Sequence, residues 1–169
     1  MVVRAKAPAL LGQPLEAVAL LLTAEPRLRV PVDGVARRQV ADSWGNPRSG
    51  GRRHEGLDVF APRGTPVRST TRGVVVRVGV VSLGGRTVTV VGPRLTRHYY
   101  AHLDRFGPQE VGDRVAAGDV VGYVGDSGNA RGTPCHLHYG VYRALVWPTN
   151  PWPLLDDAEA RPAGRASRP

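Results

Sequence analysis

The sequence of 169 residues predicts a mainly β protein built on a compact antiparallel sheet. From about residue 30 onward, short runs rich in β-branched residues alternate with Gly, Pro and Asp turn signals, a pattern typical of strands joined by tight turns. Few residues between these runs suit a helix, so neighbouring strands are expected to pair antiparallel. A chain of this length can bury a core as one domain.

Five segments are the candidate strands: residues 74–81, 86–91, 97–103, 119–124 and 136–142. A Leu-Gly-Gly stretch at 83–85 separates the first two and predicts a hairpin turn. Residues 111–122 are similar to hairpins of lipoyl and biotinyl carrier domains, which hold their cofactor on a lysine. Because Lys6 is the only lysine in the chain, we exclude a carrier function.

The two ends of the chain differ from its middle in composition. Leu15, Val18 and Leu22 follow a helical period, which predicts a short N-terminal helix, although a degenerate signal peptide is an alternative. The uninterrupted apolar run is too short to span a membrane, and no signal peptide is convincing. The polar, Pro-rich C-terminal stretch predicts disorder. We therefore expect an N-terminal segment at 1–29, a domain at 30–153 and a disordered tail at 154–169.

The net charge of +9 raises the question of a nucleic-acid partner. Arginines carry almost all of the positive charge, and they are spread through loops and tail without a dense basic block. No nucleic-acid recognition motif accompanies them, so no such partner is expected. Cys135 is the single cysteine, which excludes a disulfide framework and a cysteine-rich zinc cluster.

Two short motifs supply candidate metal ligands. In "HEGLD", His54 and Asp58 are four residues apart and can share one face of a strand or helix; the alternative is a surface histidine beside a turn aspartate. In "CHLHYG", alternation along a strand puts His136 and His138 on one face and Cys135 on the other. The apolar flanks of this pair argue against a merely solvated sheet face.

A third motif, "HYYAHL", adds further polar side chains. Strict alternation would place His98, Tyr100 and His102 on one face, with His98 exposed to solvent. His54, Asp58 and one histidine of the "HLH" pair make three protein ligands, the number typical of a catalytic zinc. The remaining histidines can act as acid or base, so these parts together favour hydrolysis of an amide or ester.

These motifs and their order resemble the lysostaphin-type (LytM-like) zinc endopeptidases, which cut peptide bonds in bacterial cell-wall peptidoglycan. The resemblance covers residues 42–150 and includes the segments that lead into "HEGLD" and "CHLHYG". It implies an antiparallel sheet with a groove on one face, a Zn²⁺ cofactor and peptidoglycan peptides as substrate. It also implies a place in the cell envelope, and we expect a monomer.

The resemblance also implies a role for each matching residue. His54, Asp58 and His138 would bind zinc, and His102 and His136 would be catalytic. Tyr100, close to His102 in sequence, is a candidate substrate-binding residue that could stabilise an oxyanion. Many family members carry glutamate where this chain has Gly140, so we expect extra room on the groove floor there and an effect on substrate choice.

Two other functions stay open at this stage. Some relatives of these enzymes have lost catalysis and activate or scaffold other wall hydrolases, but those typically lack one or more ligands. A carbohydrate- or polymer-binding module would also suit a basic protein with a groove. Stoichiometric zinc in the purified protein would favour the hydrolase over both.

Overall fold

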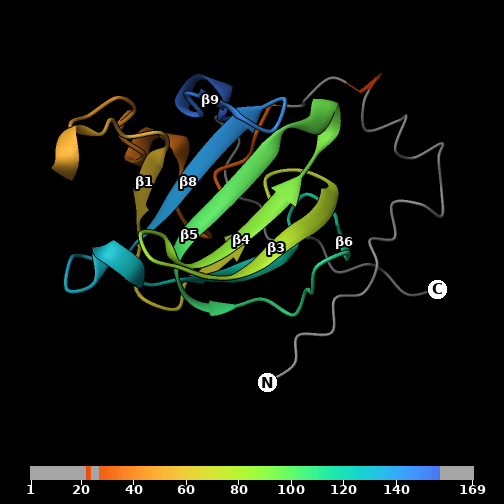
Figure 1. Ribbon diagram of the computed structural model, residues 1–169. Helices are drawn as coiled ribbons and strands as arrows, with labels where there is room; N and C mark the ends of the chain where they lie inside the picture. Colours follow the sequence, from red (N-terminus) through yellow and green to blue (C-terminus); the bar gives the residue numbers. More distant parts are fainter. Residues whose placement is uncertain (1–21, 24–26, 157–169) are drawn as a thin grey trace.

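The computed structural model describes residues 22–23 and 27–156, which form one antiparallel sheet of nine strands with connecting loops (Figure 1). The strands are β1 (Leu57–Phe60), β2 (Pro66–Arg68), β3 (Gly73–Val81), β4 (Gly85–Val91), β5 (Arg97–Phe106), β6 (Arg114–Val115), β7 (Val120–Val124), β8 (His136–Arg143) and β9 (Trp147–Thr149). Short 3-10 turns occur in the loops: η2 (Arg37–Gln39), η3 (Ser49–Gly51), η4 (Pro93–Leu95), η5 (Gly128–Ala130) and η6 (Trp152–Leu154).

The strands of the main sheet follow the spatial order β1-β8-β5-β4-β3-β6. Strand β7 pairs with β5 and β2, and β9 pairs with β8. The long strands β8 and β5 therefore lie side by side in the middle, although some 30 residues of chain separate them (Figure 1). This central pair carries most of the histidines singled out by the sequence.

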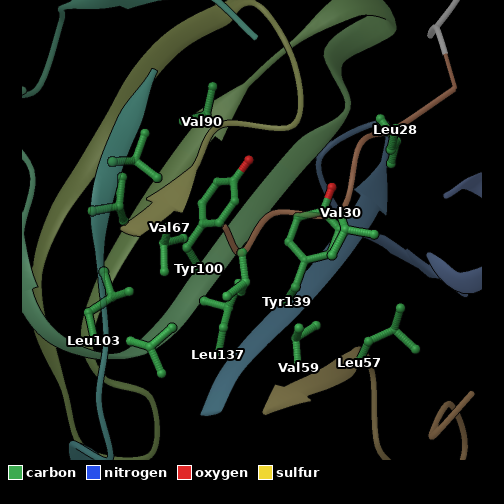
Figure 2. Close-up of a cluster of buried hydrophobic side chains, with 14 of the residues drawn as sticks. Leu28, Val30, Leu57, Val59, Val67, Val90, Tyr100, Leu103, Leu137 and Tyr139 are labelled. Atoms are coloured by element: carbon green, nitrogen blue, oxygen red, sulfur yellow. The ribbon is translucent and has the colours of Figure 1, made fainter. Parts of the chain in front are cut away.

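The hydrophobic core lies against the face of the sheet that carries Leu137 and Tyr139 from β8 (Figure 2). Val141 of the same strand is also fully buried in this core. Burying a large apolar side chain contributes about 1.5–3 kcal/mol. The alternation of β8 is thereby determined, because Leu137 and Tyr139 are both fully buried and their neighbours must point the other way. The core thus turns His136 and His138 toward the opposite face.

The predicted fold class is confirmed, and each of the five predicted strands occurs within a residue or a few of its expected bounds. The strands that the sequence did not reveal, such as β2 and β6, have two to four residues, too few for a period to show. Within the described part of the chain, no helix is long and apolar enough to cross a membrane. Of the residues that predict the N-terminal helix, Leu15 and Val18 lie outside the described part of the chain, and Leu22 alone lies within it.

The folded unit is slightly wider than the predicted range of 30–153. Leu28 and Leu155 are 0% and 1% exposed and pair with each other as an isolated bridge. Asp156 donates its backbone N–H to the Leu28 carbonyl at 2.7 Å. Residues just outside the expected boundaries therefore complete the core, because two chain segments that are distant in sequence cover each other there.

Candidate active site

The register of three neighbouring strands brings the candidate ligands together. Asp58 of β1 lies opposite His138 of β8, and His138 lies opposite Ala101 of β5. Residues that are directly opposite in an antiparallel pair project from the same face. One row across the sheet therefore carries a carboxylate, an imidazole and a small alanine, which leaves space above the sheet beside the two polar groups.

A cleft of about 510 Å³ opens over this row. The loop before β1, the β3–β4 turn and the η5 loop form its walls, and β5 and β8 form its floor. Its lining residues are Arg48, Arg52, Arg53, His54, Glu55, Asp58, Leu83, Gly84, Tyr99, Ala101, His102, Asn129, Ala130, Thr133, His136, His138 and Tyr142. All five residues predicted as ligands or catalytic histidines are among them.

Three potential metal ligands converge at one point of the cleft. One ligand atom from each of His54, Asp58 and His138 lies within 4.8 Å of the other two. His54 Nε2 is 2.9 Å from His138 Nδ1 and 3.1 Å from Asp58 Oδ1, and His138 Nδ1 is 3.3 Å from the same oxygen. Two imidazoles and a carboxylate are the donor set of many catalytic zinc sites.

A hydrogen bond to the backbone determines which ring nitrogen of His54 carries the proton. His54 Nδ1 lies 2.8 Å from the carbonyl oxygen of Ser43, which can only accept, so Nδ1 carries the proton. Nε2 is then a lone pair aimed at His138 and Asp58 when the ring is neutral. Lewis bases packed this closely repel one another unless a shared proton or a metal ion lies among them. The donors and their orientation thus fit a metal ion.

The two other candidate ligands are held in their metal-binding protonation states. Burial raises the pKa of Asp58, but hydrogen bonds and charge attraction from His138 and His54 outweigh it and leave that pKa well below the ordinary value. Burial lowers the pKa of His138. Asp58 is therefore ionised and His138 neutral near pH 7, as metal coordination requires.

Arg48 completes the surroundings of Asp58, and the sequence did not single it out. Its guanidinium donates to Asp58 Oδ2, while Oδ1 faces the two imidazoles. The side chain of Asp58 is only 12% exposed, so this ion pair orients a carboxylate that has little water around it. No spacing rule links residues 48 and 58, because the loop between them is irregular.

A β-bulge in β5 places His102 in the cleft. Arg86 of β4 pairs with Leu103, but Val88 pairs with Tyr100, so β5 contains one extra residue here. His102 takes a left-handed backbone conformation, φ 61°, and its N–H bonds to the Gly84 carbonyl at 2.8 Å. The bulge turns His102 to the same face as Ala101, contrary to strict alternation.

His102 and His136 stand side by side, next to the ligand cluster. Their ring centroids are 5.1 Å apart, and His102 lies 5.9 Å from His138. Each ring holds Nδ1 at 2.8 Å from a backbone carbonyl, that of Ser127 for His102 and that of Pro134 for His136. Both rings therefore carry the proton on Nδ1 when neutral, and both have Nε2 available to accept one.

Burial lowers the pKa of His102 to about 4, against a smaller opposing effect of the Ser127 carbonyl. His136 and His138 lower it further, since a second positive charge beside them is unfavourable. His102 is consequently neutral at pH 7 and can act as a base or as a hydrogen-bond acceptor.

The prediction for Tyr100 is wrong. Because of the bulge, Tyr100 and His102 lie on opposite faces of the sheet, and Tyr100 is fully buried in the core (Figure 2). Its hydroxyl accepts the Thr70 backbone N–H at 2.9 Å. His98, expected at the surface, is also fully buried and lies 2.8 Å from the Tyr139 hydroxyl. The tyrosines that line the cleft are Tyr99 and Tyr142.

Gly140 lies on the cleft side of β8, but the expected room above it is absent. A Cβ at this position would lie 3.0 Å from the Tyr142 ring and 3.2 Å from the Glu55 carbonyl oxygen. Arg97 stacks on the Tyr142 ring, with its guanidinium carbon 4.0 Å from the ring centroid. Glycine is therefore needed for close packing of Tyr142, which itself lines the cleft.

Comparison with known proteins agrees with the resemblance seen in the motifs. Residues 52–151 match the model of peptidase family M23. The L-Ala–D-Glu endopeptidase of Bacillus subtilis (strain 168) is 42% identical over 124 residues, which is 67% of this chain and 38% of that protein. Lysostaphin of Staphylococcus simulans is 34% identical over 88 residues, 51% of this chain and 17% of the relative. The chain thus spans well under half the length of these relatives.

Solved structures share the fold. The catalytic domain of lysostaphin from Staphylococcus simulans superposes with a TM-score of 0.61 at 29% identity, covering 68% of this chain and 89% of that one. A zinc-containing peptidase from Vibrio cholerae gives a TM-score of 0.65 at 28% identity, covering 76% of this chain and 40% of the other. Taken with the family match over more than half of the residues, these similarities show that the chain belongs to peptidase family M23.

Proposed function

We propose that this protein is a zinc-dependent endopeptidase that hydrolyses peptide bonds in the stem peptides or cross-bridges of bacterial peptidoglycan. The observation that carries the proposal is the convergence of three metal-ligand atoms within 4.8 Å, beside two further imidazoles in the same cleft. A substrate in the wall also places its site of action in the cell envelope.

His54, Asp58 and His138 would hold the metal ion. Three protein ligands leave a position open for water or substrate, as in catalytic rather than structural zinc sites. A zinc ion bound there supplies Lewis acidity, which polarises a carbonyl and lowers the pKa of water to about 7. Arg48 would keep Asp58 oriented with one oxygen toward the metal.

His102 and His136 would manage the protons of the reaction. Their Nε2 atoms face the cleft as acceptors, because both Nδ1 atoms are engaged with backbone carbonyls. One ring would take a proton from the attacking water, and the protonated ring would then stabilise negative charge on the scissile carbonyl or return the proton to the leaving amine. The bulge at His102 is what allows both rings to act on one bond.

A non-catalytic role as an activator of other wall hydrolases is less well supported. Every position that the mechanism needs is filled, and the acid–base pair has the tautomers that it needs. A protein that only binds its target has no use for two oriented lone pairs next to a cluster of metal-ligand side chains.

Metal analysis and peptide digestion together test the proposal. The purified protein should contain one zinc per chain and release products from isolated peptidoglycan. His54→Ala should remove both properties, whereas His102→Ala should keep the zinc and lose the cleavage. Zinc content and cleavage that are both intact in His54→Ala would contradict the assignment.

A further inference from the structure

One wall of the cleft carries more positive charge than the mechanism uses. Arg48, Arg52 and Arg53 all line the cleft on the loop that leads into His54. Arg48 is engaged by Asp58, so its charge is balanced within the site. Arg52 and Arg53 remain, and their charges need a separate explanation.

Both remaining arginines are bonded only to neutral groups. Arg52 donates to the carbonyl and hydroxyl of Ser49 at 3.1 and 3.4 Å, and Arg53 donates to the Gly45 carbonyl at 3.2 Å. Among the described residues, no carboxylate lies within ion-pair distance of either guanidinium. These bonds tie the side chains to the loop and leave further N–H donors of each guanidinium available.

The acidic residues of the cleft do not cancel this charge. Asp58 is already paired with Arg48, and Glu55 is the other carboxylate in the lining. Glu55 is exposed and forms no ion pair with Arg52 or Arg53. The lining of the cleft therefore contains two guanidinium groups without a carboxylate partner among the described residues, and a guanidinium is well suited to bind a planar carboxylate.

We infer that Arg52 and Arg53 form a carboxylate-binding subsite, and that the preferred substrate is an acidic peptide with a free carboxylate near the scissile bond. This inference rests on the proposed function. It favours a stem peptide, which carries free carboxylates next to its peptide bonds, over a cross-bridge made only of glycine, which carries none. The bound carboxylate would lie on the part of the peptide that is next to the metal ligands, close to the scissile bond.

A matched pair of peptides tests the inference. One contains an L-Ala–D-Glu bond with its adjacent carboxylate free, and the other carries a carboxamide at that position. In the zinc-loaded protein, kcat/KM should be about 10- to 100-fold higher for the acid, the range expected for a charge-assisted hydrogen bond. Arg52→Gln/Arg53→Gln should bring this ratio close to one, and Arg52→Lys/Arg53→Lys should restore part of it.

Two control variants separate local from overall charge. Arg38→Gln/Arg143→Gln removes the same charge from exposed residues outside the cleft and should leave the ratio unchanged. Glu55→Gln removes a negative charge from the cleft and should raise the ratio a few-fold. A wild-type ratio near one, a ratio that survives Arg52→Gln/Arg53→Gln, or an equal fall in the control variant would overturn the inference.

Two further outcomes distinguish this inference from the proposed function. Preferential cleavage of pentaglycine would overturn the acidic preference and leave the endopeptidase activity established. Calorimetric binding of both peptides measures the preference without turnover. Suppose that the acid peptide binds more tightly than the carboxamide, that Arg52→Gln/Arg53→Gln removes this difference in affinity, and that neither peptide is cleaved. That result would support the subsite and contradict the proposed function.

Discussion

Gly56, in the middle of "HEGLD", is the glycine that packs directly against His138 of the proposed metal site. A Cβ at this position would lie 2.6 Å from the Tyr139 carbonyl oxygen and 2.7 Å from Cε1 of His138. Real Cβ atoms essentially never approach another atom within 3.0 Å. The carbonyl belongs to the central strand β8 and cannot move cheaply, so the backbone around residue 56 and the imidazole of His138 must both shift.

We therefore expect Gly56→Ala to perturb both stability and metal binding. Overpacking of this kind costs about 1–3 kcal/mol of unfolding free energy. Displacing a ligand ring by even a few tenths of an ångström should also weaken zinc binding by about tenfold or more, because metal sites demand their geometry closely. Urea unfolding measures the first effect, and competition with a chromogenic chelator measures the second.

Gly79→Ala is the matched control. Gly79 lies in β3, has no positive φ, and would place its Cβ with no other atom within 4 Å. This variant should stay within about 1 kcal/mol of the wild type, since alanine mainly restricts the unfolded chain there. If Gly56→Ala unfolds and binds zinc as Gly79→Ala does, the close approach of Gly56 to His138 is not what holds the ligand.

Four other predictions follow from the same geometry. His102→Ala should lower kcat by about 10²–10⁴-fold with zinc affinity unchanged, as measured by peptide cleavage and chelator competition. The folded pKa of His102, about 4, lies below the ordinary value of 6.5, so the unfolded chain binds this proton more readily. The contribution of neutral His102 to the free energy of unfolding is fully present above about pH 6.5 and is lost as the pH falls toward 4. Between pH 7.5 and 4.5, the metal-free wild type should therefore lose about 2 kcal/mol more of its unfolding free energy than His102→Gln. Tyr100→Phe should cost about 1–3 kcal/mol of stability, because it leaves the Thr70 N–H without its acceptor, and equal kcat/KM values for variant and wild type would confirm its place in the core. Zinc removal by a chelator should abolish cleavage and lower the midpoint of thermal unfolding, and zinc should restore both; an unchanged midpoint would argue against a site built by three separate segments.

Much of the site could be predicted from the amino-acid sequence because its chemistry is concentrated in short motifs. The pair His136 and His138 lies on a regular strand, so period-2 alternation correctly placed both on one face and Leu137 on the other. The sequence also indicated the shared face of His54 and Asp58 from their spacing, and the strands from their β-branched runs. Each is a property of a few adjacent residues.

The tertiary structure alone decided where that regularity stops. A single extra residue at the bulge of β5 moves His102 into the cleft and leaves Tyr100 in the core. No local sequence pattern predicts this bulge. The pairing of Arg48 with Asp58, the close packing of Gly140 beneath Tyr142 and the unbalanced charge of Arg52 and Arg53 all depend on an irregular loop folding over the sheet. Sequence periodicity specifies which way a strand faces, whereas contacts between segments that are distant in the chain depend on the register and path of the whole fold.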